Sequence, residues 1–133
     1  NLIISNGIGI AVKDLSQASI YSCTIADNTI GISLYRKKPS FGGATAEVVN
    51  SILSNKKDIS LDAHSNIFGI NSVSLTEQEF GFRRLQVELK PNSEYQLTRN
   101  NDAYVLSGAD LENIRKFHEV KQAAYPLGHI FRK

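Results

Sequence analysis

The sequence predicts a mainly β solenoid over residues 1–75 and a small α+β unit over residues 76–133. The first observation is a repeat, since three segments alternate apolar and small residues in the same way: 4–12, 25–34 and 53–61. Their equivalent isoleucines, Ile10, Ile32 and Ile59, are separated by 22 and then 27 residues. The second observation is the Asn and Gly residues at the corners, and the third is the loss of the pattern after Leu75. A period in the low twenties, built from short strands and Asn/Gly turns, is typical of a solenoid.

Each repeat divides into three short strands whose inward residues are two positions apart, so that both side chains face the same way. In the first strand, the pairs predicted to stack are Ile10 and Val12, Ile32 and Leu34, and Ile59 and Leu61. In the second strand they are Ala18 and Ile20, then Ala46 and Val48. In the third strand they are Leu2 and Ile4, Cys23 and Ile25, and Ser51 and Leu53. Such coils would pair in parallel about 4.8 Å apart around a narrow apolar interior.

Polar corners connect these strands. Asn6, residues 27–28 and Asn55 fall at equivalent corners, and stacked Asn side chains can bond to one another in a ladder. The spacing from Ile25 to Ile32 is one residue longer than that from Ile4 to Ile10, which leaves the register of the third strand open by one residue. A fourth, degraded coil is expected over residues 62–75, with Gly69 in the inward position of Ile20.

The repeated unit at residues 22–32 reads Ser-Cys-Thr-Ile-x-x-Asn-x-x-Gly-Ile, which resembles the right-handed parallel β-helix repeat of the pectate-lyase-like superfamily. The resemblance covers roughly residues 1–75 and implies a right-handed parallel β-helix of about three coils in a secreted or cell-surface protein. That family includes polysaccharide lyases, galacturonases, alginate epimerases, metal-delivery proteins and adhesin stalks, so it is specific for architecture and weak for activity. A leucine-rich repeat has a similar period, but its Leu-x-x-Leu-x-Leu core is absent.

The second half follows different patterns. Alternation over residues 85–89, 95–97 and 104–106, with a turn at 90–93, predicts a small antiparallel sheet. Residues 107–110 are typical of a helix start, and apolar residues at helical spacing predict one amphipathic helix ending near Tyr125. We expect this helix to cap the C-terminal end of the solenoid, with binding of a partner as the alternative.

Composition excludes several classes of function. Residues 1–75 contain six basic and five acidic residues and residues 76–133 nine and eight, so no basic patch indicates a nucleic-acid partner. The single Cys23 excludes an internal disulfide framework and a multi-cysteine zinc site, and we expect it to be buried. No apolar run approaches the roughly 18 residues of a membrane span. No motif indicates a metal site, a phosphate-binding loop or a cofactor.

An insertion between the segments of Ile32 and Ile59 supplies the candidate binding site. Residues 35–43 combine cations with aromatics and leave the coil outline, so they must form a loop. The residues predicted to bind a ligand are Tyr35, Arg36, Lys37, Lys38 and Phe41. Loops on a rigid scaffold often carry function, and this one suits an anionic glycan or a partner protein. A solvated loop whose charges only maintain solubility is the alternative.

Catalytic residues are not predicted. Asp14 and Asp62 fall at aligned corners two coils apart, about 10 Å by stacking distance, which would suit an inverting pair of carboxylates. Surface carboxylates beside Lys13 are more often plain surface charge, and His64 is a lone corner residue.

The chain opens inside repeat-like sequence, so we expect a non-catalytic scaffold or interaction module that forms the C-terminal part of a larger β-helix protein and binds polysaccharide. One alternative is a fragment of a carbohydrate-active enzyme, a polysaccharide lyase or glycoside hydrolase with its catalytic coils upstream. Another is an oligomerisation module, because the N-terminal coil would expose strand edges to a second copy or to the upstream part of the same protein.

Overall fold

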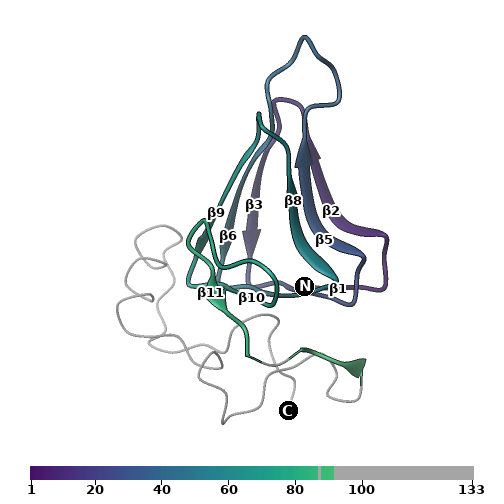
Figure 1. The fold of residues 1–133 in the computed structure, drawn as a ribbon, viewed down its shortest axis with the longest axis vertical. Helices are drawn as coiled ribbons and strands as arrows, with labels where there is room; N and C mark the ends of the chain where they lie inside the picture. The colour runs from purple at the N-terminus through teal and green to yellow at the C-terminus, as the bar shows by residue number, and fades with distance from the viewer. Residues whose placement is uncertain (87, 92–133) are drawn as a thin grey trace.

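The computed structural model describes residues 1–86 and 88–91, which form eleven strands in three parallel sheets (Figure 1). The first sheet holds, in order, β1 (Leu2–Ile4), β4 (Thr24–Ala26), β7 (Ile52–Ser54), β10 (Val73–Ser74) and β11 (Arg83–Arg84). The second holds β2 (Ile8–Lys13), β5 (Ile30–Tyr35) and β8 (Lys57–Leu61). The third holds β3 (Gln17–Tyr21), β6 (Thr45–Val49) and β9 (Asn66–Ile70). The chain visits the three sheets in turn, and we call each passage through them a coil. The prediction of a mainly β protein with parallel strand pairing is confirmed.

The register of the second and third sheets is the one that the sequence predicts. Ile32 pairs with Ile10 on one side and with Ile59 on the other, and Leu34 pairs with Val12 and Leu61. In the third sheet Ala18 pairs with Ala46, and Ile20 with Val48. The side chains of these columns form the apolar core, whose fully buried members include Ile32, Leu34, Ala46 and Val48.

The predicted register of β1 is wrong by one residue. Ile3, rather than Ile4, pairs with Ile25 and packs against the core, while Leu2 is 42% exposed. The cause lies in the corners, where Ser5 and Asp27 both adopt left-handed backbone with φ of 61° and 57°. The third coil lacks an equivalent of this corner residue, since Ala26 pairs with Ser54 while Ile30 pairs with Lys57. Cys23 is buried in the core, as predicted.

The gap expected at Gly69 lies in β9, at the end of the third coil, and the chain fills it from further along. Gly69 pairs with Val48 in the inward column, as predicted. A Cβ atom at Gly69 would lie 2.9 Å from Cδ1 and Cε1 of Phe82, so the Phe82 ring occupies the space that a side chain would take. The Gly69 N–H donates to the carbonyl of Phe80 at 2.7 Å. The turn that carries Phe82 therefore closes this end of the described core.

Only the first part of the α+β unit predicted for residues 76–133 lies within the described residues. β11 extends the first sheet in parallel beyond Leu75, and no strand is assigned to residues 85, 86, 88 and 89. Leu85 and Leu89 are buried, and the Leu89 N–H donates to the Ser54 hydroxyl at 2.9 Å. The predicted strands at 95–97 and 104–106, and the helix after residue 107, lie outside the described residues. Within the described residues, no helix is long and apolar enough to cross a membrane.

Candidate functional site

The insertion forms a loop of residues 36–44 between β5 and β6, and it projects beyond the ends of the strands at the top of Figure 1. Tyr35 ends β5 and is half-buried, whereas Lys37, Lys38 and Phe41 are exposed. The loop leaves the coil outline, as the sequence predicts.

Two carboxylates from neighbouring coils hold the beginning of this loop. Oδ1 of Asp14, which follows β2, accepts hydrogen bonds from the backbone N–H groups of Lys37 at 2.8 Å and Lys38 at 3.1 Å. Oδ2 of Asp62, which follows β8, accepts one from the Arg36 N–H at 2.6 Å. Hydrogen bonds to a carboxylate favour its charged form. The N–H of Lys38 is the main cause that lowers the pKa of Asp14, and the N–H of Arg36 is the main cause for Asp62.

This arrangement changes the interpretation of Asp14 and Asp62. The sequence raises them as an alternative catalytic pair, but each carboxylate binds backbone N–H groups at the start of the loop. Oδ1 of Asp62 also accepts the backbone N–H of His64 at 3.0 Å, so His64 belongs to the same corner. The positions of Asp14 and Asp62 therefore favour a role in ordering the loop.

The cations of the loop form no ion pair with these carboxylates, although the positive charge of Lys38 helps to lower the pKa of Asp14. Within residues 1–86 and 88–91, no side chain forms an ion pair with Arg36, Lys37 or Lys38. The Arg36 guanidinium donates through Nη1 to the carbonyl of Pro39 at 3.2 Å, and Lys38 Nζ lies 5.4 Å from the centroid of the Phe41 ring. Three positive charges and an exposed aromatic ring therefore share one held segment.

The end of the loop is fixed by close packing. A Cβ atom at Gly43 would lie 1.9 Å from the carbonyl oxygen of His64, so only glycine fits where the loop passes the next corner. The following residue, Ala44, donates its N–H to the Ser65 hydroxyl at 3.0 Å. Both ends of the loop are thus fastened to the third coil.

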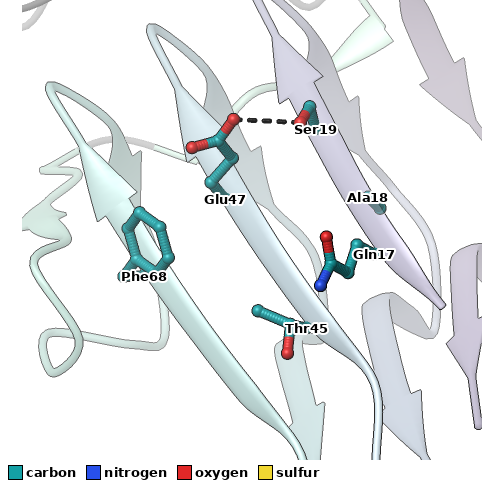
Figure 2. A pocket seen from close by; sticks show the side chains of 6 residues that line it. All are labelled: Gln17, Ala18, Ser19, Thr45, Glu47 and Phe68. Carbon is teal, nitrogen blue, oxygen red and sulfur yellow. Dashed lines mark hydrogen bonds between the residues drawn. The ribbon is translucent and has the colours of Figure 1, made fainter. Parts of the chain in front are cut away.

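A groove begins where the loop ends, on the outer face of the third sheet (Figure 2). Its volume is about 250 Å³, and it is lined by Gln17, Ala18, Ser19, Thr45, Glu47 and Phe68. Thr45 and Gln17 are the first residues of β6 and β3, next to the loop and to the Asp14 corner respectively. Phe68 is 42% exposed and stands beside Glu47, with which it is paired in register.

Glu47 is the acidic group of this groove. Its Oε1 accepts hydrogen bonds from the Ser19 hydroxyl at 2.9 Å and from the phenol of Tyr21. Partial burial raises the pKa of Tyr21, and the hydrogen bond to Glu47 raises it further. The groove therefore combines a carboxylate that already accepts hydroxyl groups with an aromatic face on the adjacent strand.

Sequence reasoning missed this groove. Ser19, Glu47 and Phe68 are unremarkable in the sequence, because they are spread over 49 positions of the chain. The available signal is the register, since Ala18 and Ala46 point inward and the next residue on each strand must point outward. Reading the outward column across three coils would have placed these residues together.

Comparison with family models, curated proteins and solved structures finds no match to this chain. Within the described residues, no group of three or more His, Cys, Asp or Glu side chains could hold a metal ion.

Proposed function

We propose that this chain is a right-handed parallel β-helix of the pectate-lyase-like type and that it acts as a non-catalytic scaffold which binds an anionic polysaccharide. The binding residues of the proposal are Tyr35, Arg36, Lys37, Lys38 and Phe41. The parallel pairing of successive coils supports this fold type, and crossovers between parallel strands are right-handed with few exceptions. The observation that carries the binding proposal is that Asp14 and Asp62 bind the loop backbone, while no ion pair within the described residues engages the side chains of Arg36, Lys37 and Lys38.

The chemistry of the loop suits uronate or sulfate groups. A guanidinium can bind a carboxylate or sulfate through two parallel hydrogen bonds, while a lysine ammonium acts as a more compact charge. Because the backbone of Arg36, Lys37 and Lys38 is already held, less backbone entropy is lost when their side chains bind a ligand. Aromatic rings such as Phe41 present an apolar face to the carbon skeleton of a sugar.

The adjacent groove extends this surface to uncharged parts of a glycan. Glu47 and Gln17 offer acceptors and donors for hydroxyl groups, and Phe68 offers a second aromatic face. A chain that binds the loop through its anionic groups could thus place a neighbouring sugar ring over β3, β6 and β9 (Figure 2).

The test compares two triple variants that change the net charge equally. One carries Arg36→Gln, Lys37→Gln and Lys38→Gln, and the other carries Lys56→Gln, Lys57→Gln and Arg84→Gln at exposed positions outside the loop. With a polyuronate in isothermal titration calorimetry, we expect the loop variant to weaken binding at least tenfold, which corresponds to about 1.4 kcal/mol, and the control variant to weaken it less than about twofold.

Added salt should weaken binding of the polyuronate by the native chain, because the contacts are exposed charges. Equal losses in the two variants would show that binding follows net charge alone and would overturn the assignment to the loop. No loss in either variant, or equal binding of a neutral glucan, would contradict the proposal as well.

A carbohydrate-active enzyme is the second candidate, and the position of Glu47 in the groove favours it. If the chain cleaves polysaccharide, the products of a polyuronate digest should appear with the native chain and disappear with Glu47→Gln. Turnover that depends on Glu47 would replace the non-catalytic proposal, whereas binding without cleavage supports it.

A further inference from the structure

The corners between the first and second sheets carry a ladder of hydrogen bonds that runs in one direction. The backbone N–H of Asn6 donates to Oδ1 of Asn28 at 2.9 Å, and the backbone N–H of Asn28 donates to Oδ1 of Asn55 at 3.1 Å. The backbone N–H of Asn55 then donates to Oδ1 of Asp58 at 2.7 Å. The side-chain oxygens of Asn28 and Asn55 therefore accept from the coil that precedes them in the chain, and Oδ1 of Asp58 accepts from Asn55 within the same coil.

The ladder is closed at one end. Asp58 is fully buried and accepts at both carboxylate oxygens, since Oδ2 binds the Ser74 hydroxyl at 2.6 Å and the Thr76 N–H at 2.9 Å. The side-chain amides of Asn28 and Asn55 donate through Nδ2 to Oδ1 of Asn55 and of Asp58, whereas the Asp58 carboxylate has no N–H and its backbone N–H donates to the Thr76 hydroxyl. The sheets end nearby as well, where β11 and the Phe82 ring cover the last coil.

The ladder is open at the other end. Asn6 is exposed, and its amide already has the orientation of the interior ladder residues, with Nδ2 bound to the carbonyl of Ile4 as Nδ2 of Asn28 is bound to Ala26. Its Oδ1 has no hydrogen-bond partner among the described residues. Asn28 and Asn55 are only 3% and 4% exposed, because the preceding coil covers each of them. No coil among the described residues covers Asn6 in this way.

The backbone and the core are open at the same end. β1, β2 and β3 are the edge strands of their sheets, so alternate backbone N–H and C=O groups point outward from each. Ile3, Ile10 and Ala18 are only partly buried, whereas their partners in the second coil are fully buried: Ile25, Ile32 and Ala46. Three strand edges, an apolar interior and an unpaired acceptor thus form one surface.

We infer that this surface binds a further coil of the same repeat, stacked in parallel register, whose corner N–H donates to Oδ1 of Asn6. The donor and acceptor pattern favours such a coil over a second copy of this chain, because a coil that runs in the same direction presents a corner N–H to Oδ1 of Asn6, as Asn6 does to Asn28 and Asn28 to Asn55. A copy stacked by its other end offers no donor, because the N–H of Asn55 is already bound to Asp58. This inference depends on the scaffold part of the proposed function and not on glycan binding, so the two tests can fail separately.

The test uses the full chain with a second copy of residues 1–22 joined ahead of Asn1. The first and second coils are 22 residues apart, as Ile10 and Ile32 show, so the added copy falls in register over β1, β2 and β3. We expect amide hydrogen exchange in β1 and β2 to slow by about tenfold or more, because edge strands become central strands. A matched control carries Ile10→Asn, Val12→Asn and Ile20→Asn in the added copy only, and should give no such protection because these polar side chains cannot be buried over the apolar core.

A second comparison isolates the ladder contact. Asn6→Leu should hardly change exchange in the native chain, where Oδ1 is exposed, but should remove a large part of the added protection in the extended chain. Unchanged exchange on extension, or equal protection by the control copy with polar inward residues, would overturn the inference. A stable dimer of the native chain that is lost on extension would overturn it too, since that result would assign the surface to a second copy.

Discussion

At the scale of single residues, Gly69 and Phe82 show how the column of inward side chains ends. An inward glycine leaves a hole beside Val48, and the Phe82 ring fills it from a turn that follows thirteen residues later. The two positions therefore depend on each other, and neither is informative alone.

This dependence predicts coupled effects on stability. Gly69→Ala should destabilise the chain by roughly 1–3 kcal/mol, because the added Cβ would lie 2.9 Å from the Phe82 ring. In a Phe82→Ala background the same change should cost little or even stabilise, since the ring is gone. Urea denaturation of the four variants measures the coupling, and Phe82→Leu is a milder background if Phe82→Ala does not fold. Additive effects in this cycle would show that the ring does not occupy the Gly69 position.

At the scale of elements, the loop of residues 36–44 depends on two carboxylates outside it. Hydrogen bonds from Lys38 and Lys37 lower the pKa of Asp14, and those from Arg36 and Ser65 lower the pKa of Asp62. The stabilisation of the loop by these bonds is therefore complete above the ordinary carboxyl pKa of about 3.9. It is lost as the pH falls through the lowered values. The order of the loop should therefore persist at neutral and mildly acidic pH.

Amide proton shifts measured by NMR can follow this loss. The amide signals of Lys37 and Lys38 should titrate below the ordinary carboxyl range, and Asp14→Asn should abolish that titration while leaving the one at Arg36, which Asp62 controls. If Asp14→Asn leaves the Lys37 and Lys38 signals unchanged, the carboxylate does not hold the loop.

The sequence predicts most of the strand arrangement but not all of the corners. Columns such as Val12, Leu34 and Leu61 follow from the period of two in each strand, which burial on one face enforces. The register of β1 could not be derived in the same way, because Leu2, Ile3 and Ile4 are all apolar and the pattern there does not distinguish two faces. The left-handed corners at Ser5 and Asp27 decide it, and their extra residue is not recognisable from composition.

The candidate site was predictable in part. The loop and its cations are visible in the sequence as an insertion, but the roles of Asp14 and Asp62 depend on three coils meeting at one edge. The groove at Glu47 and Phe68 also required the register of three strands at once. Contacts of this kind are set by stacking, so local sequence patterns do not contain them.

At the scale of the described molecule, the two ends of the stack differ. One end is closed by Asp58, β11 and Phe82, and the other presents the unpaired edges of β1, β2 and β3. The loop projects from the side of the stack (Figure 1), and the groove lies on the outer face of the third sheet (Figure 2). The groove shares β3 with the open end, whereas the cations of the loop are not part of that end. A variant of Arg36, Lys37 and Lys38 should therefore leave stacking of a further coil intact.

The placement of the loop, the groove and the open end all depends on coils that stack in the observed register. Methyl–methyl nuclear Overhauser effects test this directly, because adjacent strands lie about 4.8 Å apart. We expect cross-peaks from Leu34 to both Val12 and Leu61, and from Ile25 to Ile3. A folded chain with well-dispersed signals in which Val12, Leu34 and Leu61 show no such connection would contradict the account.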